Sequence, residues 1–254
     1  MKKIVGLAIA LLYLLPACKK EKSAETAPAA YIAIRFHPTF NNLPVQLNTA
    51  YTNAFGEEFT ISTLKFYTGQ FTLTNLPTGT RSIASGGPYY LADYSNPSSL
   101  NFTAAIKAGS YNELSFLTGV DSTRNVSGIQ SGALDPANGM FWTWNSGYIF
   151  FKLEGNSPVS TQPNGKIEYH IGGFQSPASA IRKYTGQLTA PDKWVLGNGQ
   201  TISFDINVAI DRFFTEPLPL KIVEIPVCTT PGELASGIAD NIVSAFEVTK
   251  FEIN

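Results

Sequence analysis

Side chains that bind soft metal ions are scarce in this sequence. Its 254 residues include two histidines, His37 and His170, and two methionines, one of which starts the chain. The other, Met140, stands in a short aromatic stretch with Trp142 and Trp144. Imidazole and thioether groups suit copper better than magnesium or calcium. These few residues are therefore the first candidates for a metal site.

Both histidines are predicted to lie on the less apolar faces of strands. In segment 166–171, side-chain alternation puts Glu168 and His170 on one face and the isoleucine and tyrosine side chains on the other. In the first strand, His37 shares a face with Arg35. Such faces leave imidazole nitrogens accessible to a metal ion. The alternative is that they are two unrelated surface histidines.

The tryptophan segment also has two interpretations. If it is extended, alternation puts Met140, Trp142, Trp144 and Ser146 on one surface. That surface would form the wall of a metal site, with the Met140 thioether as a further ligand. Alternatively, it packs into a hydrophobic core, where buried indoles are common.

Two other residues could bind a cation. Cys228 would be a strong copper ligand as a thiolate, or an inert small apolar residue if buried as a thiol. Asp121, in the loop Gly119–Asn125, could hold calcium through oxygen ligands. The loop lacks the regular calcium-binding pattern, so a solvated turn is the other interpretation.

Motifs of several enzyme classes are missing from the sequence. It has no HExxH, P-loop, nucleophile elbow or CxxC motif. A Ser-His-Asp triad would need one of the two histidines, and no serine stands in a recognisable turn. The formal net charge of -1 gives no support for nucleic-acid binding, which usually requires a basic face. We therefore expect a protein that is neither an enzyme nor a nucleic-acid binder.

The N-terminal residues predict export and lipid attachment. Two lysines precede the apolar run Ile4–Leu15, which is too short to span a membrane in a mature protein. The following Leu-Pro-Ala-Cys resembles a bacterial lipobox, so residues 1–17 are predicted to be a signal peptide and Cys18 the lipidated residue. Residues 18–30 have the composition of a tether. We expect a lipid-anchored protein of the cell envelope, at the outer membrane, on its periplasmic or surface face.

Strand signals dominate residues 31–254. The predicted strands are rich in β-branched and aromatic residues and are bounded by Gly, Pro, Asn or Asp. They are Tyr31–His37, Phe59–Ile61, Leu64–Leu76, Tyr111–Leu117, Tyr148–Leu153, Lys166–Ile171, Ile181–Leu188, Thr201–Ile210 and Phe246–Ile253. Asn164-Gly165 and Asn198-Gly199 are predicted hairpin turns.

One helix is predicted near the C-terminus. Thr230 is a candidate cap before Pro231, and apolar residues recur at helical spacing from Leu234 to Ala245. Residues 31–254 are thus predicted to form one all-β domain, an antiparallel β-sandwich with one short C-terminal helix.

Several motifs resemble those of the MbnP-like family and follow in the same order. The most specific are GMFWTWNSGYIFFKLEG at Gly139–Gly155 and YHIGG at Tyr169–Gly173. Weaker pieces are Phe36-His37, Gly56–Ile61, Leu64–Tyr67, Gly119–Asp121 and Ile238–Asn241. The resemblance covers nearly all of residues 31–254.

The resemblance implies copper(I) binding in the cell envelope, because family members are associated with methanobactin operons and related copper systems. In characterised relatives, imidazoles bind the metal with a kynurenine, which a dihaem enzyme of the cytochrome c peroxidase-like type forms from tryptophan. On this chain the resemblance points to His37 and His170 as imidazole ligands and to Trp142 or Trp144 as the oxidised residue. Glu168 is a candidate for orienting a nearby imidazole.

The leading expectation is thus a copper(I)-binding lipoprotein for copper acquisition, storage or delivery. A second interpretation is a surface module without metal that binds glycans or a partner protein through exposed aromatic residues. Tyr89, Tyr90 and Tyr94 would form such a platform. A third is a structural envelope component with no small ligand.

Overall fold

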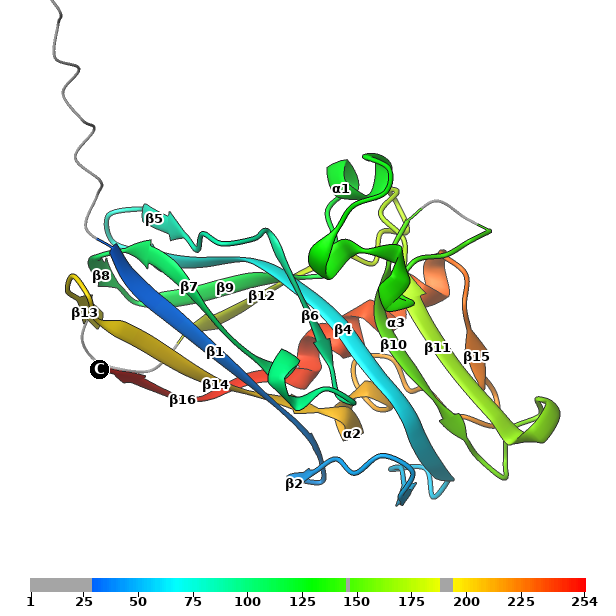
Figure 1. Ribbon diagram of the computed structural model, residues 1–254. Coiled ribbons are helices and arrows are strands. Elements are labelled where there is room, and N and C mark those ends of the chain that lie inside the picture. Colours follow the sequence, from blue (N-terminus) through cyan, green and yellow to red (C-terminus); the bar gives the residue numbers. More distant parts are fainter. Residues whose placement is uncertain (1–28, 145–146, 188–193) are drawn as a thin grey trace, which may run out of the picture.

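The computed structural model describes residues 29–144, 147–187 and 194–254 (Figure 1). The predicted signal peptide, the tether up to residue 28 and the lipidation residue Cys18 lie outside the described residues. Among the described residues, no helix is long and apolar enough to cross a membrane.

The described elements are mostly strands. In chain order they are β1 (Ala29–Phe40), β2 (Leu43–Pro44), β3 (Ala50–Thr52), β4 (Glu58–Asn75), β5 (Thr80–Ile83), β6 (Tyr89–Asp93), β7 (Asn101–Lys107), β8 (Gly109–Tyr111), β9 (Glu113–Thr118), α1 (Ser122–Val126), β10 (Ile149–Asn156), β11 (Lys166–Gly172), β12 (Arg182–Gln187), β13 (Trp194–Leu196), β14 (Thr201–Ala209), α2 (Ile210–Phe213), β15 (Val227–Cys228), α3 (Glu233–Ala245) and β16 (Phe246–Ile253). Short 3-10 turns lie at Pro97–Leu100, Gly132–Leu134, Pro136–Asn138 and Pro163–Gly165.

The first sheet is built around β1. Its strand order is β16-β14-β1-β2, and β7 pairs with the same edge of β1 as β2. Ile32, Ile34 and Phe36 are buried, whereas Arg35 and His37 point to the other face, as alternation predicts.

The second sheet is built around β4, the longest strand, which joins two predicted strands into one. One edge of β4 pairs in succession with β3, β6 and β5, and the other edge pairs with β10 and then β9. Beyond β10 the sheet continues through β11 to β15, and β12 pairs with β9. The strands β8 and β13 form a separate small ribbon.

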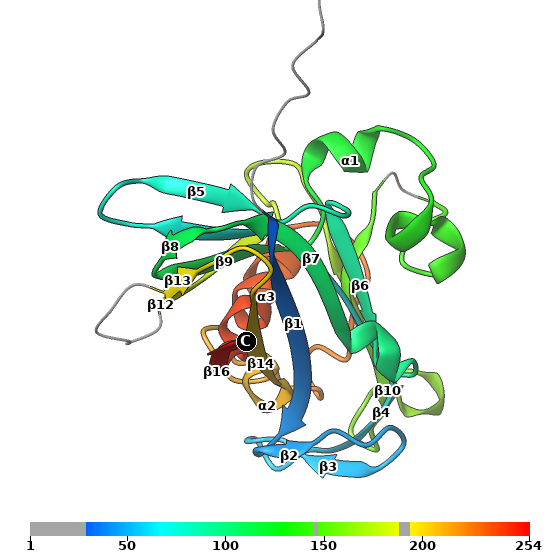
Figure 2. The same ribbon diagram turned by 60° about the vertical axis from the view of Figure 1, so that its left-hand side comes forward.

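The core lies between the two sheets and is closed by α2 and α3 (Figure 2). Phe36 of β1 packs edge-on against Phe66 of β4, with ring centroids 5.3 Å apart. Phe246, which follows α3, packs against both rings. On the β10–β11 side, Phe213 of α2 stacks on Phe151. The inner face of the second sheet is therefore covered by β1 and by the helices.

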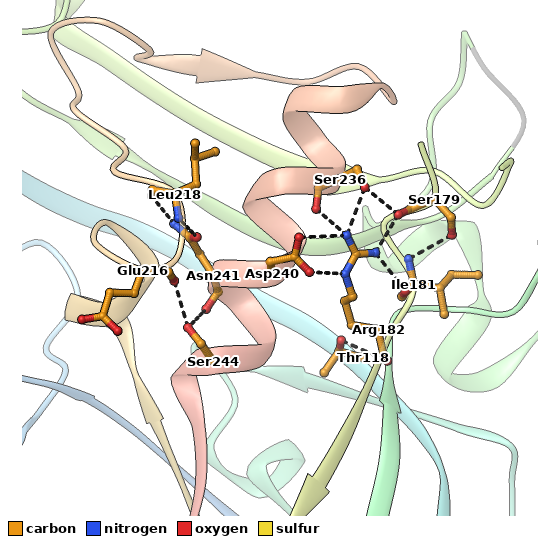
Figure 3. A network of polar contacts seen from close by, with 10 residues as sticks. All are labelled: Thr118, Ser179, Ile181, Arg182, Glu216, Leu218, Ser236, Asp240, Asn241 and Ser244. Carbon is orange, nitrogen blue, oxygen red and sulfur yellow. Dashed lines mark hydrogen bonds and ion pairs between the residues drawn. The ribbon is translucent and has the colours of Figure 1, made fainter. Parts of the chain in front are cut away.

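Polar side chains anchor α3 to this core (Figure 3). Arg182 of β12 donates from Nε to Asp240 at 2.5 Å and from Nη2 to the carbonyl of Ser236 at 2.7 Å. The next residue, the fully buried Asn241, accepts from the Leu218 amide at 2.8 Å and donates to the Phe213 carbonyl at 2.9 Å. The motif Ile238–Asn241 therefore has a structural role.

The predicted mostly-β fold with a short C-terminal helix is confirmed. The sheets are mixed rather than purely antiparallel, because β1–β14 and β11–β15 pair in parallel. The closing strand Phe246–Ile253 is confirmed residue for residue.

Two local predictions were wrong. The helix starts at Glu233, and its cap position is Gly232 with no side-chain hydrogen bond, rather than Thr230. Asn198-Gly199 joins β13 to β14, which belong to different sheets, so this turn does not form a hairpin. Asn164-Gly165 does turn the chain between β10 and β11, and both residues have positive φ.

Candidate metal site

Strand register places His170 on the outer face of the second sheet. Neighbours across β4, β10 and β11 point to the same side, so Lys65, Lys152 and His170 form one row. The next row, Phe66, Phe151 and Ile171, points into the core. His170 therefore faces away from the core.

Two carboxylates meet this imidazole. The Nε2 atom of His170 lies 2.7 Å from Oε1 of Glu154 and 3.6 Å from Oε1 of Glu168. Glu154 and Glu168 are direct partners in the β10–β11 register. Their ligand atoms and that of His170 all lie within 4.8 Å of one another, the only such group of three found among the described residues. We call Glu154, Glu168 and His170 the His170 cluster.

The neighbours of Glu154 favour its ionised form. The hydrogen bond with His170 and the charge of Lys152 lower the pKa of Glu154 to about 2, against the opposing effect of burial. Lys166 lies 2.9 Å from Glu168, and Lys152 lies 3.4 Å from Glu154. The Glu154 carboxylate is therefore available as an anionic oxygen ligand at neutral pH.

Trp142 covers the strand next to this cluster. A Cβ atom at Gly172 would lie 2.7 Å from Cη2 of the Trp142 indole and 2.4 Å from the carbonyl oxygen of Tyr148. Alternation puts Gly172 on the same face as His170. The indole thus rests on β11 where Gly172 leaves room for it, two residues along from His170. This contact joins the tryptophan segment to the YHIGG motif.

The tryptophan segment forms a tight loop before β10 rather than a strand. The Trp142 amide donates to Gly147 O at 3.2 Å, and the Ile149 amide donates to Met140 O at 2.9 Å. Trp142 is 4% exposed and Trp144 is 62% exposed, although their ring centroids lie 5.9 Å apart. The two indoles therefore lie in different environments. An extended segment would have placed both on one surface.

The outcome for the other residues of this segment is mixed. Met140 is fully buried and belongs to the hydrophobic core, which was one of its two interpretations. Ser146 lies outside the described residues. The buried Nε1 atom of Trp142 has no hydrogen-bond partner among the described residues.

His37 lies in a different cluster, on the outer face of the first sheet. Its Nε2 lies 2.8 Å from Oδ1 of Asp205, and its side chain is 53% exposed. Arg35 donates to both oxygens of Asp205, at 2.7 and 2.9 Å. Arg35, chiefly, and His37 lower the pKa of Asp205 to about 2. We call Arg35, His37 and Asp205 the His37 cluster.

The fold keeps the two histidines apart. Phe36 and Phe66 meet between the sheets, so their outward neighbours His37 and Lys65 point in opposite directions. His170 shares the Lys65 face, and packed sheets are about 10 Å apart. A copper(I) site made by both imidazoles therefore does not fit this arrangement.

Cys228 does not join either cluster. It pairs with Tyr169 in the β11–β15 register, on the inner face of the sheet, opposite His170. Burial raises the pKa of its thiol to about 11. The thiol is protonated at neutral pH, which agrees with the interpretation as a small buried apolar residue.

Asp121 and the tyrosines have structural partners. Asp121 caps α1 by accepting from the Arg124 amide at 2.9 Å, and it also accepts from the Tyr89 hydroxyl and from Gln70. The carboxylate oxygens of Asp121 thus already accept hydrogen bonds from neighbouring groups of the protein. The geometry therefore does not support the predicted calcium site. Tyr89 is buried, and Tyr90 stacks on Phe102.

The prediction that Tyr89, Tyr90 and Tyr94 form an exposed aromatic platform was therefore wrong. Tyr94 is also partly buried, and its hydroxyl donates to the Val45 carbonyl. Each of these residues makes a separate contact within the domain, so the three do not form one exposed surface.

The sequence interpretation missed Glu154 and Gly172 as parts of the site. Glu154 directly follows the predicted strand Tyr148–Leu153, two residues after Lys152. Its meeting with His170, however, depends on the β10–β11 register, which period-2 patterning does not specify. The role of Gly172 depends on a loop from another part of the chain.

Comparison with known proteins agrees with the fold. A family model described as MbnP matches residues 29–230. Among solved structures, the chain is similar to MbnP from Methylosinus trichosporium, with 13% identity, a TM-score of 0.51, and coverage of 87% of this chain and 98% of that chain. At that identity the likeness concerns the fold. No curated protein sequence matches the chain.

Proposed function

This chain belongs to the MbnP family, and from that premise we propose that it is a copper-binding protein of the cell envelope. Its role would be the acquisition, storage or delivery of copper rather than catalysis. Lipid attachment through Cys18 would hold it at the outer membrane. The copper site we propose is the His170 cluster, without His37.

One observation carries this proposal. The two most specific sequence motifs meet at one place, where the Trp142 indole rests on Gly172 beside His170. At the same place two carboxylates stand within reach of the imidazole. An imidazole with nearby anionic oxygens is a donor set that transition metals use.

Trp142 is the better candidate for oxidation to kynurenine. Cleavage of its five-membered ring by peroxide, with the excised carbon leaving as formate, would give an aniline nitrogen and a ketone oxygen on the residue whose ring rests on Gly172. Among the described residues, its Nε1 has no hydrogen-bond partner to lose. Trp144 is mostly exposed, so its oxidation would place the new donors at the surface. The oxidant would be peroxide, used by a dihaem enzyme of the cytochrome c peroxidase-like type.

The test is a competition titration with copper and a chromophoric chelator. The exported domain would be compared with His170→Ala and with His37→Ala as the matched control. We expect His170→Ala to weaken copper binding by about 10-fold or more, because even partners that only orient a ligand contribute that much. His37→Ala should stay within about 2-fold of the parent, since it has no part in the cluster. Equal losses in both variants, or none in His170→Ala, would overturn the proposal.

Peptide mass spectrometry of protein from its native host tests the maturation separately. We expect a mass gain matching kynurenine on Trp142, with Trp144 unchanged. Unmodified tryptophan at both positions would remove kynurenine from the proposal and leave the His170 cluster as the only source of ligands.

A further inference from the structure

The His170 cluster offers mainly oxygen donors. Glu154 and Glu168 supply carboxylates, and His170 supplies the one nitrogen ligand of the group. Thiolate and thioether ligands select copper(I), whereas imidazole with carboxylate suits divalent ions. The soft side chains of this chain are elsewhere: Met140 lies in the core, and Cys228 is on the inner face of the sheet.

The charges of the glutamates in the cluster also favour a divalent ion. Glu154 and Glu168 are direct cross-strand partners, and like charges so placed destabilise a sheet. Lys152 and Lys166 now balance them, at 3.4 and 2.9 Å. A divalent ion would neutralise both carboxylates at once, whereas a monovalent ion would neutralise one. To bind there, the ion must displace the ammonium groups of Lys152 and Lys166 from the carboxylates.

The cluster is also open to incoming ions. Of the three cluster residues, Glu154 lines a surface hollow of about 310 Å³, together with Lys166, Ser62 and Asn164. The His170 side chain is 13% exposed, so it is sheltered but not sealed. An ion bound at Glu154 would therefore border this hollow.

Lys152 connects the cluster to the tryptophan loop. Its ammonium donates to the Gly139 carbonyl at 3.0 Å while it lies near Glu154. An arriving cation would compete with this ammonium for Glu154. Lys152 is thus positioned to weaken metal binding.

From these observations we propose that the His170 cluster binds a divalent transition-metal ion through His170, Glu154 and Glu168, and that it prefers copper(II) to copper(I). This inference rests on the proposed function, since it specifies the oxidation state of the ion at the same site. Among first-row divalent ions, copper(II) generally binds such donors most tightly.

The experiment compares three probes on the metal-free exported domain with unmodified tryptophan: Cu²⁺, Zn²⁺, and Cu⁺ kept reduced without oxygen. We expect one equivalent of Cu²⁺, with an electron paramagnetic resonance spectrum showing one imidazole nitrogen. Glu154→Gln and Glu168→Gln, which keep the side-chain shape, should each weaken Cu²⁺ and Zn²⁺ binding by about 10-fold or more and Cu⁺ binding by less.

Two further variants sharpen the test. Lys152→Met should strengthen Cu²⁺ binding, because it removes the competing ammonium. Glu252→Gln, an exposed carboxylate paired with Lys250, is the matched control and should change nothing. Circular dichroism of each variant verifies that it is folded.

The outcomes separate this inference from the proposed function. Tight Cu⁺ binding that requires His170, with Cu²⁺ binding indifferent to both glutamates, would overturn the inference alone. Copper binding that is independent of His170 in both oxidation states would overturn the proposed function as well.

Discussion

The two histidine clusters are built from similar parts and differ in what surrounds them. In each, an imidazole Nε2 lies within 2.8 Å of a carboxylate oxygen on the outer face of a sheet. In the His37 cluster, Arg35 takes both oxygens of Asp205, and the imidazole is half-exposed. In the His170 cluster a second carboxylate replaces the guanidinium, and the Trp142 loop shelters the strand.

This difference shows why a histidine and a carboxylate are not by themselves a metal site. A bidentate guanidinium neutralises its carboxylate and uses its oxygen lone pairs. Each of the two opposed glutamates has only a single-point contact with a lysine ammonium, which a metal ion can displace more easily than a bidentate guanidinium. The neighbours of each pair, rather than the pair itself, therefore decide between an ion pair and a metal site.

Removing the Trp142 indole, which packs on β11 near His170, should have the largest effect on the free energy of unfolding. We expect Trp142→Ala to lower the free energy of unfolding by about 3–5 kcal/mol, the usual cost of deleting a buried aromatic side chain. Trp144→Ala should change it by no more than about 0.5 kcal/mol, because that ring is mostly exposed. Urea unfolding followed by circular dichroism measures both. Similar losses in the two variants would show that the indoles are equally buried.

Gly172→Ala tests the contact between the two motifs. The added methyl group would meet the Trp142 ring and the Tyr148 carbonyl, so we expect a loss of about 1–3 kcal/mol. Part of that cost should vanish in a Trp142→Ala background, because the clash with the ring is gone. Urea unfolding of the single and double variants gives this coupling. Strictly additive losses would mean that the ring does not rest on Gly172.

The carboxylate pKa values should respond differently in the two clusters. In metal-free protein, His170→Ala should raise the pKa of Glu154 from about 2 towards its usual value of 4.5, because His170 is the main cause of the shift. His37→Ala should leave the pKa of Asp205 low, because Arg35 is the main cause there. Carboxyl-carbon NMR titration measures both.

The same shifts have consequences for acid stability. A carboxylate whose folded pKa is depressed stabilises the fold above its unfolded pKa, and this stabilisation disappears as the pH falls through the folded value. Between about pH 4.5 and 2, the parent should therefore lose stability more steeply than His170→Ala. Parallel acid-unfolding curves for the two proteins would contradict this.

Removing His37 should have the smallest effect on the fold. Its imidazole is 53% exposed, and Arg35 still pairs with Asp205 without it. We expect His37→Ala to change the free energy of unfolding by about 0.5 kcal/mol or less, as for exposed ion pairs. A loss comparable to that of Trp142→Ala in the same urea measurement would make the His37 cluster structurally important.

Much of the fold could be predicted from the sequence, because strand and helix signals are local. Lys166–Ile171 and Phe246–Ile253 became strands nearly as predicted, and the apolar spacing of Leu234–Ala245 marked α3. Parallel pairing could not be predicted, because β1 and β14 are far apart in the chain and their patterns fit either direction.

By itself, the sequence determined which residue types were available for the site and which strand face each histidine would occupy. Period-2 alternation is a property of the local backbone, so Glu168 and His170 had to share a face in any strand. The order of the motifs also pointed to the family. Only the tertiary structure decided that Glu154 meets His170, that Gly172 receives Trp142, and that His37 lies on an opposite outer face. Those contacts depend on strand register, on a loop that turns back, and on which sheet each strand joins, and these arise from packing between distant segments rather than from local pattern.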